Sequence, residues 1–167
     1  MIMEEKRIET IELRQKFPDD FVRDDEFREQ LSITLKKDNI LDVCRSLKTD
    51  KRFLYDYLVD ITAVDYLKAE GIERYAVIYN LYSHPRCTRL RLNVLVPEKD
   101  MAISSVYQLW KTADWLEREV YDMFGITFTG HPDLKRLLMP DDFEGHPLKK
   151  DYPLKGRGER ESFKIIK

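Results

Sequence analysis

Glycine and proline are distributed unevenly along this chain, and this limits what each part of it can fold into. Residues 1–124 contain four glycines and prolines together, whereas residues 125–167 contain nine. Proline fixes φ and donates no backbone hydrogen bond, so a segment that meets it every few residues forms neither a regular helix nor an interior strand. We therefore predict a globular domain over residues 1–125 and an extended, proline-punctuated tail over residues 126–167.

The first part is expected to be an ordinary soluble domain. The length of 167 residues fits one domain with a tail, and a content of 43% hydrophobic and 36% charged residues fits a globular protein with a highly charged surface. The formal net charge of -2 gives no overall attraction to nucleic acid or acidic lipid. Residues 146–167, however, carry seven bases against three acids. This basic end either meets an acidic partner or is simply solvated.

Side-chain alternation predicts four strands. Apolar and polar residues alternate over residues 31–35 and again over residues 90–96. Aromatic and β-branched residues favour strand over residues 58–67 and 75–82. A turn signal at residues 83–86 joins the last two strands into a hairpin.

Helical spacing predicts four helices. The first covers residues 4–17, and the second begins after Asp38, whose carboxylate is expected to cap it. The third is expected to begin after Asp100, and the last runs from a Thr112 cap to Gly125, where a positive φ costs glycine little. The apolar stripes of the last three are Ile40, Val43, Cys44 and Leu47; Ile103, Val106, Tyr107 and Trp110; and Ala113, Leu116, Val120 and Met123. Together these elements predict an α+β fold: a mixed or antiparallel sheet with helices packed on it, followed by the extended C-terminal tail.

Two classes of function are disfavoured by the residue types present. Iron–sulfur clusters and structural zinc take about four clustered Cys or His ligands, and this chain has only Cys44 and Cys87. We therefore expect no redox centre, metal or cofactor in this chain. Arg86, Arg89 and Arg91 give the hairpin a basic edge, but we expect no aromatic residues on its outer face to stack on bases, which disfavours nucleic acid.

No stretch of the sequence is expected to cross a membrane. A spanning helix needs about 20 mostly apolar residues, and the longest apolar run here, residues 75–82, is read as a strand. Without a signal peptide, a cytoplasmic chain with free thiols is the default expectation. Any membrane association is expected to come through partners.

The charged residues of the last helix allow three interpretations. Glu117, Arg118, Glu119 and Asp122 could do acid–base chemistry if one carboxylate were buried. They could equally form a solvated face, which is the common situation for a charged helix. The aromatic residues around them favour a third interpretation, a network buried against a partner.

Two histidines in the tail raise the alternative of a metal-dependent hydrolase. His131 and His146 each lie in a GHP triplet, and Asp133, Asp141 and Asp142 could complete a site. The two histidines are fifteen residues apart on a flexible segment, without the close spacing typical of zinc ligands. We therefore favour histidines held by packing and hydrogen bonds.

The tail has an apolar or aromatic anchor every few residues. The anchors are Phe128, Leu134, Leu137, Leu138, Met139, Phe143, Leu148, Tyr152 and Leu154. Such side chains suit a groove on another protein, or they could fold back over the chain's own sheet. We favour a protein partner, because the tail lacks the periodicity of a self-contained layer.

The stretch from Glu117 to Leu154 closely resembles one known family. Its motifs are ERE at 117–119, DMFGI at 122–126, GHPDL at 130–134, LLMPDD at 137–142, EGHPL at 144–148 and KDYPL at 150–154, with DITAVDY at 60–66 upstream. They resemble the C subunit of the bacterial proton-pumping NADH:quinone oxidoreductase, which belongs to the thirty-kilodalton subunit family of respiratory complex I. Lys135 and Lys149 stand where the family often has arginine, and Phe143 stands where tryptophan is usual.

The resemblance implies a cofactor-free subunit of the peripheral arm, on the cytoplasmic side of the cell membrane. Its expected partners are the quinone-site subunit and the neighbouring iron–sulfur subunits, while FMN, the clusters and quinone belong to those partners. An equivalent subunit of a membrane-bound hydrogenase or of a quinone reductase with another donor is the alternative. We expect no catalytic residue here. The expected partner-docking residues are Glu117, Arg118, Glu119, Asp122, His131, Asp133, Arg136, Asp141, Asp142, Phe143, His146, Lys150 and Tyr152.

Overall fold

Three helices and seven strands are formed by the residues that the computed structural model describes, which are 7–67, 69, 71 and 73–158. The helices are α1 (Ile8–Lys16), α2 (Ile40–Thr49) and α3 (Ala113–Phe124). The strands are β1 (Phe21–Phe27), β2 (Gln30–Lys36), β3 (Tyr57–Asp65), β4 (Tyr75–Ser83), β5 (Thr88–Val96), β6 (Ala102–Ser104) and β7 (Thr127–Thr129). None of the helices in this described part of the chain is both long and apolar enough to cross a bilayer.

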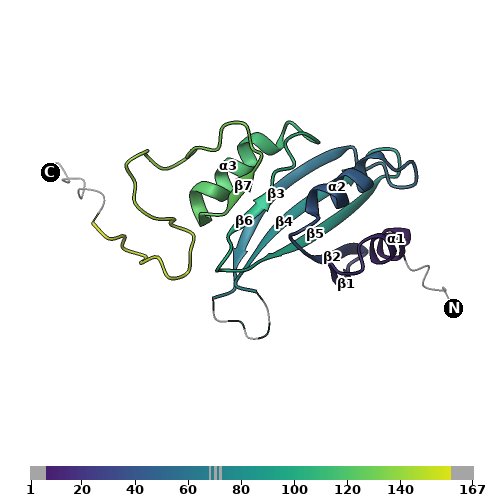
Figure 1. Cartoon of the computed structure of the whole chain (residues 1–167), viewed down its shortest axis with the longest axis horizontal. Coiled ribbons are helices and arrows are strands. Elements are labelled where there is room, and N and C mark those ends of the chain that lie inside the picture. Colours follow the sequence, from purple (N-terminus) through teal and green to yellow (C-terminus); the bar gives the residue numbers. More distant parts are fainter. Residues whose placement is uncertain (1–6, 68, 70, 72, 159–167) are drawn as a thin grey trace.

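Five of the strands form one mixed sheet in the order β1-β2-β5-β4-β3 (Figure 1). Every neighbouring pair is antiparallel except β2 and β5, which are parallel. The short strands β6 and β7 form a separate parallel pair. A mixed sheet with helices packed on it is the predicted fold class, which is therefore confirmed.

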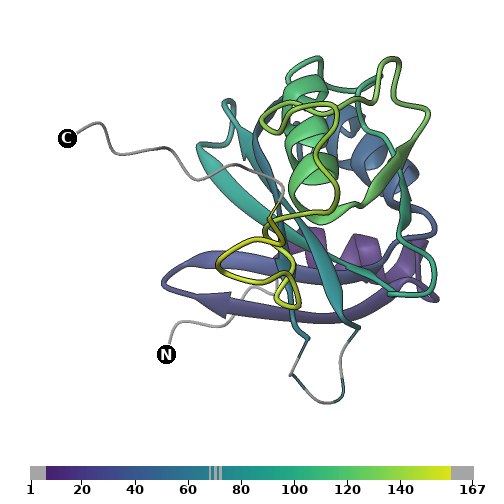
Figure 2. The same cartoon turned by 90° about the vertical axis from the view of Figure 1, so that its left-hand side faces the viewer.

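Side-chain alternation gives the sheet one buried face and one open face. Leu90, Leu92 and Val94 of β5 are fully or almost fully buried, whereas Arg89 and Arg91, which alternate with them, are exposed. The buried side chains join α2 and α3 in one hydrophobic cluster, and both helices lie on the same side of the sheet (Figure 2). An antiparallel or mixed sheet often has one solvated face, and here the alternation expected for β5 is confirmed.

The apolar stripe predicted for α2 is also confirmed, but the predicted helix caps are wrong. Asn39, not Asp38, occupies the N-cap position of α2, and it makes no capping hydrogen bond. Its side chain instead donates to Asp20 Oδ2 at 2.7 Å. Thr112 precedes α3 without a capping hydrogen bond either. Gly125, by contrast, follows α3 with φ 76°, as expected for a left-handed residue that ends a helix.

The helix expected after Asp100 is wrong. Residues 102–104 form β6 instead, and they pair in register with residues 127–129 of β7. Ile103, Val106 and Trp110 are buried as predicted, but they reach the core from a short strand and a turn. The pairing with β7, a strand that follows 23 residues later, satisfies backbone groups that a helix would otherwise have satisfied internally. A local pattern cannot show that distant partner.

Strand β1 has no alternating pattern and was not predicted. It contains four charged residues, and most of its side chains are exposed. It lies at the edge of the sheet, where charged side chains discourage pairing with another chain.

The hydrophobic core extends past the residue at which the globular part was predicted to end. Ile126 is 0% exposed and Phe128 is 2% exposed, and both belong to the central cluster. The division into residues 1–125 and 126–167 stays a prediction, with β7 lying just beyond its boundary.

Replacing Phe128 with alanine should therefore destabilise the whole domain. A buried Phe→Ala substitution costs about 3–5 kcal/mol through lost burial and a residual cavity. Urea unfolding followed by circular dichroism would measure the free energy. The control is Phe27→Ala, because Phe27 is 69% exposed, and its effect should stay within about 0.5 kcal/mol. Equal effects at the two positions would mean that β7 does not belong to the core.

Candidate functional site

The segment after β7, residues 130–158, forms turns and bends without helix or strand, and we call it the ribbon. It passes over α3 and then reaches the end of the sheet where β3 and β4 meet (Figures 1 and 2). Two charged side chains of α3, Arg118 and Asp122, hold its first half.

Asp122 is the centre of these contacts. Its side chain is fully buried, and Oδ1 accepts a hydrogen bond from Arg136 Nη1 at 2.7 Å. Oδ2 accepts three consecutive backbone N–H groups, from Leu137 at 3.0 Å, Leu138 at 2.7 Å and Met139 at 2.8 Å. Burial alone would raise the pKa of Asp122, but these N–H groups and the guanidinium hold that pKa below its ordinary value. The ionised carboxylate therefore gathers the ribbon into a tight curve, as backbone N–H groups gather round an anion.

Arg136 closes the other side of this curve. Its Nη2 donates to the carbonyl oxygens of Phe143 at 2.7 Å and Gly145 at 3.1 Å. The planar guanidinium has five donors, so one side chain bonds to Asp122 and to both carbonyls. Arg118 adds two hydrogen bonds, from Nε to the Lys135 carbonyl at 3.2 Å and from Nη2 to the Arg136 carbonyl at 3.1 Å.

The ribbon then returns to the C-terminal end of α3. His146 Nδ1 lies 2.9 Å from the Asp122 carbonyl oxygen, and the Leu148 N–H donates to the Met123 carbonyl at 3.1 Å. The last carbonyls of a helix have no partner within the helix, so the ribbon satisfies two of them. Burial lowers the pKa of His146, which favours the neutral ring. A Cβ atom on Gly125 would come within 2.6 Å of this ring.

A second anchor lies at the end of β3. The Lys150 N–H donates to Asp65 Oδ2 at 2.8 Å, and Arg74 Nη2 bridges Asp65 at 3.2 Å and Asp151 at 2.9 Å. Arg74 also pairs with Glu98. Burial opposes ionisation of Asp65, but Arg74 and the Lys150 N–H lower its pKa overall. Neither Asp65 nor Arg74 is among the predicted site residues, because the second anchor joins parts of the chain 85 residues apart.

Glu117 has a different role from its charged neighbours. It is 0% exposed, and it accepts hydrogen bonds from Ser105 Oγ at 2.6 Å and from the Val106 N–H at 2.7 Å. It therefore ties α3 to the turn after β6, and its side chain has no surface left for a partner. Burial raises its pKa to about 7.

His131 also turns inward. Its Nε2 lies 3.2 Å from the Asp114 carbonyl, its Nδ1 accepts the Asp133 N–H at 3.1 Å, and its side chain is fully covered. His146 binds the carbonyl of Asp122, two helical turns further along α3, which is roughly 12 Å along the axis. The structure does not bring the two rings together, and no three potential metal-ligating residues cluster within its described residues. This geometry gives no support to the hydrolase alternative.

The thirteen predicted docking residues are divided between internal contacts and the surface. Glu117, Arg118, Asp122, His131, Arg136 and His146 brace the chain itself. Glu119, Asp133, Asp141, Asp142 and Lys150 are exposed, and Phe143 and Tyr152 are half-buried with ring centroids 6.1 Å apart. Contact of any of them with a partner stays a prediction. The large apolar side chains that the ribbon exposes are Leu138 at 57%, Leu148 at 53% and Leu154 at 104%.

Most of this chain matches one known family. Residues 33–158 match the family described as respiratory-chain NADH dehydrogenase, 30 Kd subunit. The C subunits of NADH-quinone oxidoreductase from Geobacter metallireducens and Geobacter sulfurreducens are each 46% identical over 162 residues, which cover 97% of this chain and 98% of the relative.

Two solved structures share the fold. One, described as Nqo5 of the trypsin-resistant fragment (1-134), is 36% identical with a TM-score of 0.62, and the match covers 74% of this chain and 95% of that one. The other is a chain of the membrane-bound sulfane sulfur reductase, an archaeal respiratory membrane complex. It has a TM-score of 0.70 and covers 86% of this chain and 83% of that one, but at 23% identity it shows the fold alone.

The contact between Gly125 and His146 can be tested by a pair of alanine substitutions. Gly125→Ala and Gly130→Ala both place a Cβ at a positive φ, which costs about 1–2 kcal/mol. Only Gly125→Ala also drives a Cβ into the His146 ring, because the space beside Gly130 is open. Thermal unfolding should therefore show a larger loss for Gly125→Ala, and the NMR signals of His146 should move only in that variant. Equal losses and an unmoved ring would contradict the contact.

Glu117 should make stability depend on pH in a direction opposite to most acids. Between its ordinary pKa of 4.5 and its folded pKa of about 7, the folded state holds a proton that the unfolded state has lost. The stabilisation is complete below pH 4.5 and is lost as pH rises to about 7. Glu117→Gln cannot lose this proton, so its free energy of unfolding should not fall with it. As pH rises from 5 to 8, the free energy of unfolding of the variant minus that of the unsubstituted protein should increase by up to about 3 kcal/mol.

Urea unfolding at several pH values would measure this difference. The same substitution at the exposed Glu119 is the matched control, and its curve should run parallel to that of the unsubstituted protein. A parallel curve for Glu117→Gln would show that Glu117 does not titrate with folding.

Proposed function

We propose that this chain, which belongs to the 30 kDa subunit family of the respiratory-chain NADH dehydrogenase, is a structural subunit in the peripheral arm of an NADH-quinone oxidoreductase. In this proposal, partner subunits carry electrons from NADH to quinone and the complex pumps protons. The isolated chain has no activity of its own. The relatives named as C subunits of NADH-quinone oxidoreductase, which match over nearly the whole chain, favour NADH as the donor.

The observation that carries the structural role is the shape of the ribbon. The chain holds residues 135–150 against itself through Asp122, Arg136 and Asp65, while three leucines of the ribbon point to solvent. A segment already fixed by its own domain loses less conformational entropy when it binds than a free one would. We therefore assign the exposed leucines to contact with partner subunits and the buried polar residues to positioning them.

A structural role also agrees with the small number of cysteines in the sequence. Cys44 is buried and Cys87 is exposed, and two separate thiols are fewer than the four ligands that an iron–sulfur cluster usually takes. Electron transfer between cofactors held by different subunits requires those subunits to keep fixed positions. In our proposal this chain limits their motion by binding beside them.

The proposed partners are the quinone-site subunit and the neighbouring iron–sulfur subunits. The proposed location is the cytoplasmic side of the cell membrane, which the chain reaches through the complex. The exposed acids and bases of the ribbon, including Asp141, Asp142 and Lys150, are proposed to lie at the rim of this contact.

A double variant in which Leu138 and Leu148 are both replaced by aspartate tests the docking role. Each leucine buried by a partner contributes about 1.5–3 kcal/mol, so the double variant should bind its partners at least on the order of a hundredfold more weakly. The chain should then be lost from the purified complex, and NADH:quinone activity should fall with it. Its own thermal stability should be unchanged, because both side chains are more than half exposed.

Val22→Asp provides the matched control, since Val22 is 46% exposed on β1, far from the ribbon in sequence. This variant should assemble normally. A chain shortened after Gly130 retains β7 and the core, and it should fail to assemble. Full assembly and activity with that shortened chain would rule out the docking role.

A further inference from the structure

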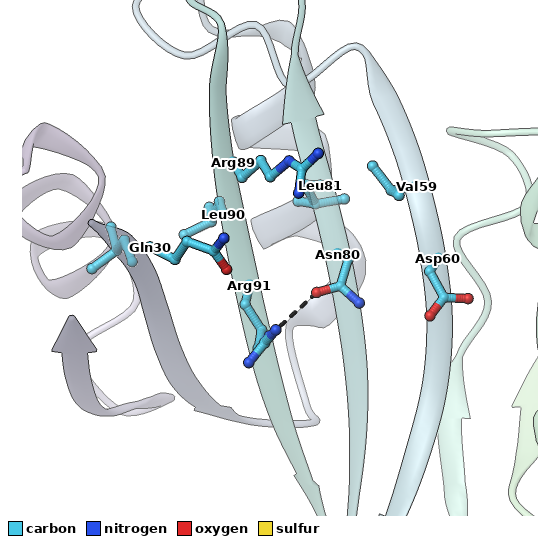
Figure 3. Close-up of a pocket in the computed structure, with 9 residues that line it drawn as sticks. Gln30, Val59, Asp60, Asn80, Leu81, Arg89, Leu90 and Arg91 are labelled. Atoms are coloured by element: carbon cyan, nitrogen blue, oxygen red, sulfur yellow. Dashed lines mark hydrogen bonds between the residues drawn. The ribbon is translucent and has the colours of Figure 1, made fainter. Parts of the chain in front are cut away.

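The open face of the sheet carries a second candidate contact surface. Cross-strand pairing places Arg91 of β5 opposite Asn80 of β4, and Asn80 opposite Asp60 of β3. Figure 3 shows these side chains on the face of the sheet away from the helix behind it. The row spans three strands and lines a shallow hollow of about 300 Å³, together with Gln30, Val59 and Arg89 among others.

A bulge in β3 shapes one wall of this hollow. The pairing between β3 and β4 shifts between Leu58 and Asp60, so alternation is interrupted at Val59. As a result Val59 and its neighbour Asp60 both line the hollow, and Val59 is 47% exposed. Bulges re-aim side chains in this way and are common beside functional surfaces.

Arg89 and Arg91 share this hollow and a neighbouring one with Asp60 and Asp25 but pair with neither acid. Arg91 Nε donates to the neutral Asn80 Oδ1 at 3.3 Å, and neither Arg89 nor Arg91 forms an ion pair with any residue in the described ranges. Arg86, the third base of the hairpin, differs because it pairs with Glu9 at 2.6 Å. Arg89 and Arg91 are two residues apart on one strand, so their positions are about 6.6 Å apart along it. Alternate side chains of an extended peptide have the same spacing.

Apolar surface continues from the arginines. A neighbouring hollow of about 340 Å³ shares Gln30, Leu31 and Arg91 with the first and is also lined by Phe27, which is 69% exposed. Both hollows have room for a few side chains but not for a folded domain. The expectation that aromatic residues are absent from this face is wrong, because Tyr82 lies directly opposite Arg89 and Tyr57 lies opposite Tyr82.

We propose that this face binds an extended acidic segment of a partner subunit, with its alternate carboxylates on Arg89 and Arg91 and apolar side chains in the two hollows. This surface is on the opposite side of the sheet from α2, and the proposal does not require the ribbon to dock. The tyrosines would also suit stacked nucleotides, but the net charge of -2 disfavours nucleic acid, so we make that ligand an outcome of the test.

The first experiment places a photo-crosslinking amino acid at Val59 in the fully assembled complex and identifies the linked peptide by mass spectrometry. A peptide of a partner subunit with at least two Asp or Glu residues at alternate positions would support the proposal. A second copy of this chain, a nucleic acid, a peptide without acids or no crosslink at all would overturn it. The same amino acid at Lys51, an exposed position in the turn after α2, controls for nonspecific crosslinking.

The second experiment reverses the charges with Arg89→Glu and Arg91→Glu together. The purified complex is washed from about 0.1 M to 1 M salt, over which the Debye length falls from about 10 Å to 3 Å. The double variant should be released at lower salt than the unsubstituted chain, with about tenfold weaker retention. Lys51→Glu, the control, should behave as the unsubstituted chain does.

The two proposals can fail separately in these tests. The charge-reversed chain keeps Leu138 and Leu148, so normal retention at every salt concentration overturns only the proposal for the open face. If the Leu138 and Leu148 variant assembles normally while the charge-reversed chain is released, only the docking role of the ribbon is lost.

Discussion

The buried carboxylate of Asp122 organises the part of the molecule that is not a regular domain. It accepts three successive N–H groups and one guanidinium, and the guanidinium of Arg136 in turn binds two carbonyls that lie 7 and 9 residues further on. Removing one partner of such a network leaves buried polar groups unsatisfied, which costs more than the net worth of each bond. The curve of the ribbon between Arg136 and Gly145 therefore depends on this one side chain.

The sheet could be predicted wherever a strand is half-buried. In β2 and β5 one face meets the core and the other meets solvent, so alternation in the sequence carries the signal. The charged edge strand β1 and the short pair β6 and β7 have no such signal, because their pairing depends on distant residues. The helix expected after Asp100 failed for the same reason: its buried residues are spaced as in a helix, but β7 determines the backbone conformation.

The candidate site could be located from the sequence, but the direction of its side chains could not. Residues 117–154 were predicted to hold the site from three features: the glycine and proline spacing, the charged last helix and the family motifs. For Arg118 and Asp122 the sequence left open acid–base chemistry, a solvated face or a network against a partner, yet both hold the ribbon. The second anchor at Asp65 and Arg74 was missed, because only the folded chain brings Lys150 beside β3. On the hairpin, the tyrosines of β4 and β3 that lie across from Arg89 could not be predicted either, because the sequence does not show the strand register.

The return of the ribbon to the end of α3 has a consequence for how this chain can vary. His146 and Leu148 bind the carbonyls of Asp122 and Met123, while Leu137 to Met139 bind the side chain of the same Asp122. Both ends of the intervening loop are thus hydrogen-bonded to the same turn of α3. An insertion or deletion between these two sets of hydrogen bonds would move one set away from its partners on the helix. The number of residues in this loop is therefore more strictly determined than the identity of those at its exposed crest, Asp141 and Asp142.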